Sequence, residues 1–484
     1  MSLSTTIKTP NVTYEQPQGL FINNEFIKGV EGKTFETINP TDEKVITSVY
    51  EATEKDVDVA VKAARTALDG AWHNLADLFE RDMETLASIE ALDNGKAITM
   101  AKADVGNAAG CLRYYGGWAD KIHGQTIDTN NETLSYTRHE PIGVCGQIIP
   151  WNFPILMWAW KIGPAIAAGN TVVIKTAEQT PLSGLYAAKL IVEAGFPPGV
   201  INVISGFGKT AGSAISSHMD IDKVAFTGST LVGRIILQAA AKSNLKKVTL
   251  ELGGKSPNIV FDDADIDNAI SWSNFGIFYN HGQCCCAGSR LLVQEGIHDK
   301  FVARFKERAA KNQLGNPFDV KTFQGPQVSQ LQYDRIMEYI NHGKNEGATV
   351  AVGGDRHGDQ GYFIQPTIFT GVTPDMKIAQ EEIFGPVITI QKFKDEAEAI
   401  RIGNSTTYGL AAGVHTKNVN TAIRVSNALK AGTVWVNSYN LISYQAPFGG
   451  FKESGIGREL GSYALENYTQ IKTVHYRLGD ALFG

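Results

Sequence analysis

The sequence lacks long apolar runs, an excess of positive charge and the cysteine content of a disulfide scaffold. No window approaches the roughly 18 uninterrupted apolar residues of a membrane-spanning helix, which excludes an integral membrane protein of that kind. The net charge of −6 at pH 7 argues against a general nucleic-acid binder, because such proteins present a basic face. The five cysteines are an odd number, which argues against a secreted disulfide framework.

Signals of targeting and of ligand binding are also missing. The start of the chain has neither the apolar core of a signal peptide nor the arginine-rich pattern of a transit peptide, so the expected location is the cytoplasm. The ten histidines show no metal-ligand spacing, and no metal site is expected. The dinucleotide fingerprint G-x-G-x-x-G is absent. With 43% apolar residues the chain can nevertheless bury large cores, which excludes intrinsic disorder.

Short apolar runs that alternate with helical segments dominate the middle of the chain. The runs are 142–149, 171–175, 200–204, 223–227 and 248–252, and the helical segments are 154–168, 181–194, 210–217 and 231–242. This alternation predicts a parallel sheet covered by helices on both faces. It resumes after Ser256 and reaches about Phe451, which predicts a second α/β unit. Two earlier helices are expected over 54–68 and 75–95.

Two other segments have a different pattern. Residues 126–139 and 470–477 alternate polar and apolar side chains, which is typical of exposed antiparallel strands. Exposed strands of this kind invite pairing with another chain or another sheet. No internal repeat or low-complexity tract is visible, and the length of 484 residues suggests about three structural units.

Three consecutive cysteines are the sharpest chemical feature, in His281-Gly-Gln-Cys-Cys-Cys-Ala-Gly-Ser289. Structural zinc sites use spaced pairs of cysteines, so adjacent thiols do not match one. A disulfide between neighbours is strained, because their Cα atoms lie nearer than bridge geometry prefers. Two interpretations remain: buried structural thiols, or a reactive nucleophile that small residues such as Gly282 and Gly288 leave open to substrate.

Two polar residues stand at the ends of predicted buried strands. Glu251 lies in Leu-Glu-Leu-Gly-Gly, where partial desolvation raises a carboxyl pKa and favours a general base. The alternative is a residue that only organises the strand end. Asn152 lies in Pro-Trp-Asn-Phe-Pro, at the carboxyl end of a strand, where open α/β sheets bind ligands. Its amide is either an oxyanion-hole donor or the cap of the following helix.

Two glycine-containing turns are candidates for phosphate binding. Gly206–Gly212 is G-x-G-x-x-x-G, one residue longer than the dinucleotide fingerprint, and is a weak signal. Residues 226–233 run from a strand directly into a helix. This places free backbone N–H groups of Gly228 and Ser229 at the helix N-terminus, which suits a pyrophosphate. Charged side chains past other strand ends decide nothing by themselves; they include Lys175, Glu178 and Glu382.

Together these stretches resemble the NAD(P)-dependent aldehyde dehydrogenase superfamily, most closely its tetrameric class 1/2 type. The resemblance runs from FINNEF to YTQIKTV through PWNFP, KTAEQT, FTGST, LELGGKSP, GQCCCAGSR, EEIFGPV and PFGGFK, in this order. It implies an α/β, aldehyde dehydrogenase-like fold and a homotetramer. The implied parts are a Rossmann-like NAD-binding domain (1–123 and 142–253), an α/β catalytic domain (254–453) and small β oligomerisation strands (124–141 and 467–484).

The resemblance also implies a role for each candidate residue. Cys285 is expected to be the nucleophile and Glu251 the general base, with Asn152 and the Cys285 backbone N–H as the oxyanion hole. The residues expected to bind NAD are Ile149, Trp151, Lys175, Glu178, Gly208, Gly212, Gly228, Ser229, Gly233, Glu382 and Phe384. The residues expected to line an aromatic substrate tunnel are Phe153, Trp160 and Phe448.

The implied reaction is the oxidation of an aldehyde to a carboxylic acid with NAD and water. Thiolate attack gives a thiohemiacetal, loss of hydride gives a thioester on Cys285, and Glu251 activates the water that hydrolyses it. The tunnel suits small aldehydes such as acetaldehyde, which would place the enzyme in ethanol degradation. A coenzyme A-acylating relative is one alternative, although such relatives generally lack the glutamate. A structural lens protein is another, although such members have lost catalytic residues that this chain keeps.

The sequence departs from the class 1/2 pattern at two places. Between Asn74 and Leu75 the chain is shorter than its relatives, which is expected to remove the front of a surface helix. Gln470 stands where the class commonly has glutamate, and the usual arginine partner is Lys247 here, while Arg458 is retained. The neutral Gln470 is expected to change or weaken the contact between subunits.

Overall fold

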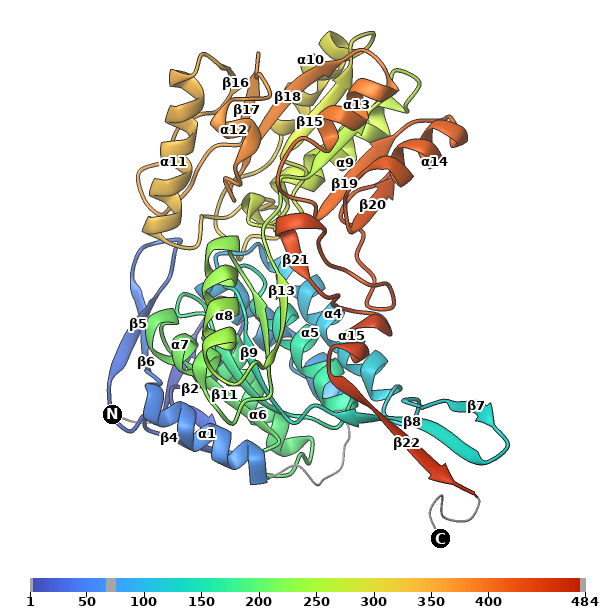
Figure 1. Ribbon diagram of the computed structural model, residues 1–484. Coiled ribbons are helices and arrows are strands. Elements are labelled where there is room, and N and C mark those ends of the chain that lie inside the picture. The colour runs from blue at the N-terminus through green and yellow to red at the C-terminus, as the bar shows by residue number, and fades with distance from the viewer. Residues whose placement is uncertain (1–2, 67–74, 479–484) are drawn as a thin grey trace.

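The computed structural model describes residues 3–66 and 75–478 and contains two large sheets covered by helices (Figure 1). An eight-stranded sheet lies in the lower half of the view and a seven-stranded sheet in the upper half, while a three-stranded sheet projects at the lower right. Among the described residues no helix is long and apolar enough to cross a membrane. The predicted α/β class is confirmed.

The eight-stranded sheet is parallel at its centre, in the order β21-β13-β12-β9-β10-β11-β3-β4. Its parallel strands are β9 (Val144–Ile148), β10 (Thr171–Thr176), β11 (Ile201–Ser205), β12 (Lys223–Thr227) and β13 (Lys247–Glu251). Its antiparallel edge strands are β21 (Gly455–Ile456), β3 (Leu20–Ile22) and β4 (Glu25–Ile27). Each predicted apolar run therefore forms a strand, and all but the start of β13 is buried.

Two hydrophobic cores cover opposite faces of this sheet. Along β10, Val172 and Ile174 belong to one core and Val173 to the other, because side chains alternate along a strand. Helices of the first core are α2 (Leu75–Arg81), α3 (Met83–Asp93), α4 (Ile98–Gly116), α5 (Pro154–Ala167) and α6 (Leu182–Glu193). Helices of the second core are α1 (Glu54–Thr66), α7 (Ser213–Ser217), which follows a π-helical turn (Gly208–Gly212), and α8 (Thr230–Lys242).

The single helix expected over 75–95 is wrong, because Asp82 separates α2 from α3. The backbone of Asp82 has φ −95° and ψ 18°, and its carboxylate accepts a hydrogen bond from the Tyr186 hydroxyl of α6 at 3.1 Å. This contact joins segments far apart in the chain, so no local pattern reveals it. The shortening expected beside Asn74 falls outside the described residues, as does the end of the helix expected over 54–68.

The seven-stranded sheet has the order β16-β17-β18-β15-β14-β19-β20, and only β16 is antiparallel to its neighbour. Its strands are β14 (Pro257–Val260), β15 (Arg290–Gln294), β16 (Thr349–Val352), β17 (Thr367–Thr370), β18 (Val387–Phe393), β19 (Ala411–His415) and β20 (Thr433–Val436). Its helices are α9 (Ile266–Phe278), α10 (His298–Ala309), α11 (Gln330–Asn345), α12 (Lys377–Gln380), α13 (Glu396–Gly403) and α14 (Val419–Ala428). The alternation predicted after Ser256 is therefore present.

The projecting sheet consists of β7 (Thr126–Asn130), β8 (Thr133–Pro141) and β22 (Thr469–Arg477), all antiparallel (Figure 1). The expected antiparallel strands are confirmed, and Ile471 on β22 is 66% exposed. The Gln470 side-chain amide donates to the Pro141 carbonyl at 3.3 Å. Lys247 instead donates to the Glu466 carbonyl at 2.7 Å, in α15 (Tyr463–Glu466).

Two hairpins complete the N-terminal region: β1 (Ser4–Lys8) with β2 (Thr13–Pro17), and β5 (Thr34–Ile38) with β6 (Val45–Tyr50).

Candidate active site

The candidate site lies at the topological switch point of the eight-stranded sheet. The chain runs from β9 outward to β10 and β11, then crosses to β12 on the other side of β9. The segments that follow β9 and β12 therefore flank a crevice at the carboxyl edge, where open α/β sheets bind ligands. Residues 252–256 lead from the end of β13 at this edge to the start of β14, so the second sheet begins beside it.

Asn152 follows β9 and reaches the loop that carries the cysteines. Its side-chain Nδ2 donates to the Gln283 carbonyl at 3.0 Å, and its own carbonyl accepts from Asn280 Nδ2 at 2.9 Å. Phe153 is the N-cap of α5 and makes no side-chain cap hydrogen bond, so the helix-cap interpretation of Asn152 is wrong. Asn152 is 4% exposed, and the carbonyl that its amide contacts belongs to Gln283, two residues before Cys285 in the chain.

A turn shapes the three cysteines. The preceding η2 (Tyr279–Gly282) places Asn280 and His281 at positive φ, and the Ala287 N–H then donates to the Cys284 carbonyl at 3.0 Å. All five cysteines lie within the described residues and are free. Cys284 and Cys286 are buried, whereas Cys285 is partly exposed. Both interpretations of the motif are thus represented: the outer thiols fit structural packing and the central thiol is accessible to a substrate.

Glu251 is the last residue of β13 and is 2% exposed. Burial raises the pKa of its carboxyl to about 8, although a hydrogen bond with the Cys285 thiol and the charge of Lys161 act in the opposite direction. In the described part of the chain its Oε1 atom is buried and has no hydrogen-bond partner. A carboxyl with this pKa exchanges protons near neutral pH, as a general base must.

The Cys285 thiol is protonated in this environment. Hydrogen bonding with Cys284 and Cys286, burial and the charge of Glu251 all raise the pKa of Cys285 well above that of an ordinary thiol. Because the thiolate is the nucleophilic form of cysteine, Cys285 needs a proton acceptor before it can attack. Glu251 is hydrogen-bonded to it and is the group placed to take that proton.

Lys175 and Glu178 lie at the end of β10, beside the glycine turn that was singled out in the sequence. Lys175 Nζ donates to the Gly206 carbonyl at 2.7 Å and lies 3.5 Å from Glu178 Oε2, and burial lowers the pKa of Lys175. A Cβ at Gly212 would lie 3.8 Å from Lys175 Cε, while one at Gly208 would meet nothing within 4 Å. The π-helical turn therefore leaves open space next to this ion pair.

The turn from β12 into α8 differs in one respect from expectation. The Gly228 N–H donates to the Glu251 carbonyl at 3.1 Å, so it is not the free donor that the sequence predicted, because the ladder between β12 and β13 extends by one bond. Ser229 caps α8, and its Oγ accepts from the Val232 N–H at 3.4 Å. A Cβ at Gly233 would lie 2.8 Å from Leu252, which explains the close packing of α8 on the chain after β13.

Glu382 and Phe384 enter the site from the segment before β18. Glu382 Oε1 accepts from the Gly254 N–H at 3.0 Å, and burial raises its pKa to about 7. A Cβ at Gly253 would lie 2.1 Å from Glu382 Oε2, so a larger residue there would displace the Glu382 carboxyl. Phe384 has φ +61° and packs edge-on against Trp151 with ring centroids 5.2 Å apart. These contacts bring Trp151 and both predicted residues of this segment to one wall of the site. Ile149 is also at this edge, since its N–H donates to the Lys175 carbonyl at 3.1 Å.

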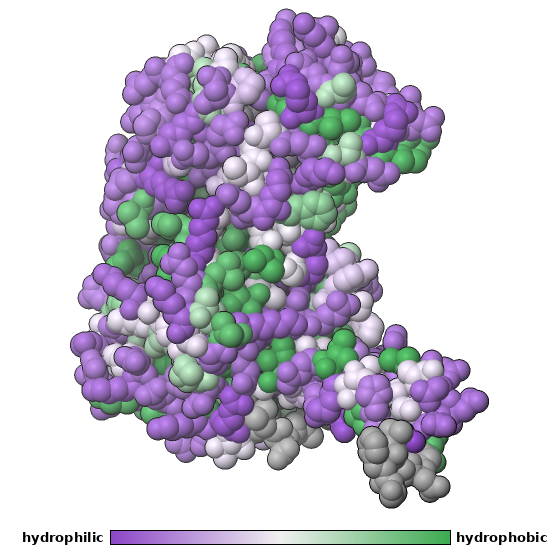
Figure 2. Space-filling view, in the orientation of Figure 1, coloured by the Kyte–Doolittle hydropathy of each residue, from purple (hydrophilic) through white to green (hydrophobic). Residues whose placement is uncertain are grey.

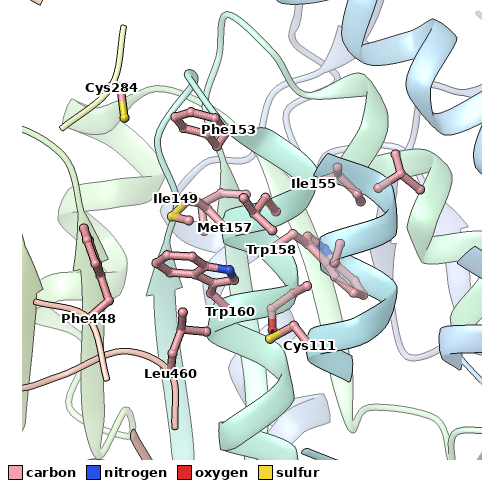
Figure 3. Packing of buried hydrophobic residues seen from close by; sticks show 14 of the residues in the cluster. Cys111, Ile149, Phe153, Ile155, Met157, Trp158, Trp160, Cys284, Phe448 and Leu460 are labelled. Atoms are coloured by element: carbon pink, nitrogen blue, oxygen red, sulfur yellow. Dashed lines mark hydrogen bonds between the residues drawn. The ribbon is translucent and has the colours of Figure 1, made fainter. Parts of the chain in front are cut away.

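The aromatic residues predicted for a tunnel are packed on the same side of the cysteine loop. Figure 3 shows Phe153, Trp160 and Phe448 near Cys284, and all four residues belong to one hydrophobic cluster. The rings of Trp160 and Phe448 are edge-on with centroids 5.6 Å apart, and each of the three residues is no more than 7% exposed. The arrangement brings the three aromatic residues together beside the candidate nucleophile.

A buried ion pair behind Glu251 was missed in the sequence. Lys161 Nζ lies 2.5 Å from Glu459 Oε1 and donates to Thr227 Oγ1 at 2.7 Å. Lys161 is fully buried, and its charge lowers the pKa of Glu251. The available signal was the lone cation in the apolar helix segment WAWKIGPAIA, whose charge requires a buried partner.

Tyr279 was also missed, and it joins the two halves of the molecule. Its hydroxyl donates to Asp104 Oδ1 at 3.1 Å, and Asp104 Oδ2 lies 2.5 Å from Lys96 Nζ. Lys96 Nζ sits 4.3 Å from the centroid of the Phe153 ring, and the Tyr279 ring stacks on Phe153 at 6.0 Å. This network clamps Phe153, the residue after Asn152, and no local sequence signal marks it.

Comparisons with known proteins show the family and the fold of this chain. The model of the aldehyde dehydrogenase family matches residues 26–474. The chain is 83% identical to an aldehyde dehydrogenase of Emericella nidulans over 99% of both chains. It is 57% identical to a mitochondrial aldehyde dehydrogenase of Homo sapiens over 94% of this chain and 91% of the relative. The NAD+ complex structure of an aldehyde dehydrogenase from Bacillus cereus superimposes with a TM-score of 0.94 at 53% identity, over 95% of this chain and 96% of that chain.

Proposed function

This chain belongs to the aldehyde dehydrogenase family, and from that premise we propose how its residues oxidise an aldehyde to a carboxylic acid. The enzyme is an NAD-dependent oxidoreductase. The observation that carries the proposal is the convergence of Cys285, Glu251 and Asn152 at one edge. Asn152 is held to the cysteine loop at 3.0 Å, and Glu251 is hydrogen-bonded to the Cys285 thiol.

In the first step Glu251 accepts the proton of Cys285, and the thiolate attacks the aldehyde carbonyl. The carbonyl oxygen becomes an alkoxide in the thiohemiacetal, which the Asn152 amide and the Cys285 backbone N–H stabilise by hydrogen bonds. One such preorganised donor is worth about 3 kcal/mol of transition-state stabilisation. The buried position of Asn152 supports this role, because its amide dipole is held in place before the charge develops.

The cofactor residues fit NAD in their chemistry. NAD, when bound, accepts the hydride of the thiohemiacetal. Lys175 and Glu178 would hold the adenosine ribose beside the open turn at Gly208, and the start of α8 at Ser229 would face the pyrophosphate. Glu382 and Phe384 would hold the nicotinamide ribose. Glu382 is already fixed by the Gly254 N–H, and its wall continues into Trp151.

Before the last step Glu251 gives the proton that it took from Cys285 to the solvent. It then takes a proton from water, and the hydroxide attacks the Cys285 thioester, so that the acid is released and the Cys285 thiolate leaves. The role rests on the buried carboxyl, whose pKa of about 8 lets it hold and give up a proton near neutral pH. The same residue argues against a coenzyme A-acylating activity, which transfers the acyl group to a thiol instead of to water. The buried ion pair of Lys161 and Glu459 would help to position the Glu251 carboxyl.

The substrate that we propose is a small aliphatic aldehyde such as acetaldehyde. Phe153, Trp160 and Phe448 would line the substrate site, since they belong to the hydrophobic cluster against which Cys285 packs and lie near Cys284 (Figure 3). Such a lining binds hydrocarbon and carries no charge that would select an ionic substrate. With acetaldehyde as substrate, the enzyme would serve the oxidation of ethanol, most simply in the cytoplasm.

We propose a homotetramer, on two exposed surfaces. The first is the projecting sheet, whose strand β22 exposes Ile471. The second is α8, where Leu231 is 71% and Ile235 55% exposed, and Figure 2 shows a hydrophobic patch in this part of the molecule. Exposed apolar surfaces of this kind mark interaction sites. A sedimentation velocity run that gives only monomer at micromolar concentration would contradict the proposal.

The test of the proposed function is aldehyde-dependent formation of NADH in the absence of coenzyme A. The wild-type enzyme is expected to turn over acetaldehyde, whereas Cys285→Ala is expected to form no NADH while still binding NAD. The matched control is Cys111→Ala, which removes a buried thiol from α4. Turnover by Cys285→Ala, or a strict need for coenzyme A in the wild type, would overturn the mechanism.

A further inference from the structure

The three adjacent cysteines bring their sulfur atoms into one small volume. All three Sγ atoms lie within 4.8 Å of one another, and those of Cys284 and Cys286 are 3.5 Å apart. In an extended strand, successive side chains point to opposite faces and would be separated. Here the turn closed by the Ala287 N–H and the Cys284 carbonyl turns the three side chains toward a common point.

These distances are close to those of sulfur ligands around one soft metal ion. Zinc binds thiolate at about 2.3 Å, which in a tetrahedron places neighbouring sulfur atoms about 3.8 Å apart. The Cys284–Cys286 pair is already at 3.5 Å, and the third sulfur needs a shift of about 1 Å at most to close the set. Sequence spacing had excluded metal because structural sites use separated pairs, but that rule does not cover a turn of this shape.

Buried charged side chains lie near the cluster. Glu251 Oε1 is buried without a hydrogen-bond partner in the described chain, but the carboxyl is not among the atoms that lie within 4.8 Å of one another. Two buried cations lie near these groups: Lys161 near Glu251 and Lys96 near Cys284. These buried cations offset the negative charge of a metal–thiolate centre, which a buried site otherwise disfavours.

We propose that Cys284, Cys285 and Cys286 form a three-sulfur binding site for a soft, thiophilic divalent cation such as Zn²⁺ or Cd²⁺. Binding converts three thiols to thiolates and releases three protons, so that three metal–sulfur bonds replace three sulfur–hydrogen bonds without any change in oxidation state. The bound ion occupies the Cys285 sulfur and so blocks its attack on an aldehyde. Only this block rests on the proposed function; the metal site does not.

The test uses the reduced, full-length protein under anaerobic conditions, with Cd²⁺ as the probe. We expect one Cd²⁺ per chain, an ultraviolet thiolate-to-cadmium charge-transfer band of the intensity of three sulfur ligands, and full reversal by a chelator. Cys284→Ser and Cys286→Ser are each expected to lower the band to two sulfur ligands and to weaken binding by at least about tenfold. The matched controls are Cys111→Ser and Cys145→Ser, which remove single buried thiols elsewhere.

Wild-type affinity in the double variant Cys284→Ser/Cys286→Ser, or no charge-transfer band at saturating Cd²⁺, would overturn the proposal. If a variant fails to fold, alkylation of the wild-type protein tests the site instead. Cd²⁺ is expected to protect all three thiols of the 284–286 peptide from the alkylating reagent. Modification of that peptide at the rate seen without metal would refute the site. Activity separates the two proposals. Full turnover with the three-sulfur band present would leave the metal site standing and remove Cys285 from the mechanism.

Discussion

The two sheets of this protein reach the same site from opposite ends of their strands. The eight-stranded sheet presents carboxyl ends: Glu251 ends β13 and Asn152 follows β9. The seven-stranded sheet presents amino ends: Cys285 precedes β15 and Glu382 precedes β18. Parallel sheets usually bind ligands at their carboxyl edge, and the first sheet follows that rule while the second does not.

The two sheets therefore contribute different functional groups to the candidate site. The first sheet supplies a switch point, where a crevice suits a cofactor, together with the proposed base Glu251 and the proposed amide donor Asn152. The second sheet supplies the Cys285 thiol, on the turn that precedes β15 and lies at the crevice. The catalytic centre therefore depends on how the sheets pack together, and the Asp104–Tyr279 hydrogen bond is one of the contacts that fixes this packing.

Removing the base from the first sheet is expected to have the largest effect. Glu251→Gln should lower the steady-state rate by about 10²–10⁴-fold, because hydrolysis of the thioester loses its general base. Intact-mass spectrometry should then detect an acyl adduct on Cys285 after one turnover. The control is Glu307→Gln, on the exposed surface of α10. Wild-type turnover without an adduct would show that another group activates water.

The same residue predicts a pH dependence. The rate should rise with pH up to about 8 and level off above it, because the base must be ionised, and Glu251→Gln should lose this rise.

The free energy of unfolding should instead decrease as the pH rises. The folded carboxyl keeps its proton to about pH 8, while the unfolded one loses it near 4.5, so the free energy of unfolding falls between these pH values. Chemical denaturation of both proteins at pH 5 and pH 9 measures the difference.

Removing the amide donor from the first sheet is expected to have the next largest effect. Asn152→Ala should lower kcat by about 10²–10³-fold, because the developing alkoxide loses one preorganised donor. The dissociation constant for NAD should not change, which fluorescence titration can measure. Asn11→Ala is the control, since Asn11 is exposed and its amide donates to Glu84 at 2.9 Å. An equal loss in both variants would contradict the assignment.

Breaking the contact between the two halves is expected to act on stability. Asp104→Asn should lower the free energy of unfolding by at most about 3–5 kcal/mol, because the buried Lys96 loses its partner at 2.5 Å and keeps only Glu90 at 3.7 Å. Asp77→Asn is the matched surface variant: its carboxylate pairs with Arg113 while 70% exposed, and the loss should be about 0–1 kcal/mol. Urea unfolding measures both. Similar losses in the two variants would contradict the buried role of Asp104.

The smallest effect is expected at the edge of the cofactor crevice. The Glu178 carboxylate should repel the 2′-phosphate of NADP, and about 1 kcal/mol of repulsion at this partly exposed site corresponds to about fivefold in affinity. Glu178→Gln should therefore raise kcat/KM for NADP relative to NAD by about fivefold. The comparison needs both cofactors at one aldehyde concentration. A wild-type enzyme that already prefers NADP would refute the inference.

Much of the fold was predictable from local patterns. The apolar runs that form β9 to β13 were located because a strand buried on both faces must be apolar at every position. The break at Asp82 was not, because the Tyr186 hydroxyl that holds its carboxylate comes from a separate helix. The Gly228 N–H was predicted to be free for the same reason: its acceptor, the Glu251 carbonyl, belongs to another strand.

By itself, the sequence determined which residues are candidates for catalysis: a thiol among glycines, a carboxyl and an amide at strand ends, and their order along the chain. Only the tertiary structure decided what those groups touch. It directed Asn152 to the Gln283 carbonyl and not to the helix start, placed Lys161 and Glu459 behind Glu251, and folded three sulfur atoms into one volume. The physical reason is that periodicity reports a residue's own burial, whereas hydrogen bonds and ion pairs join residues that become neighbours only when the whole chain packs.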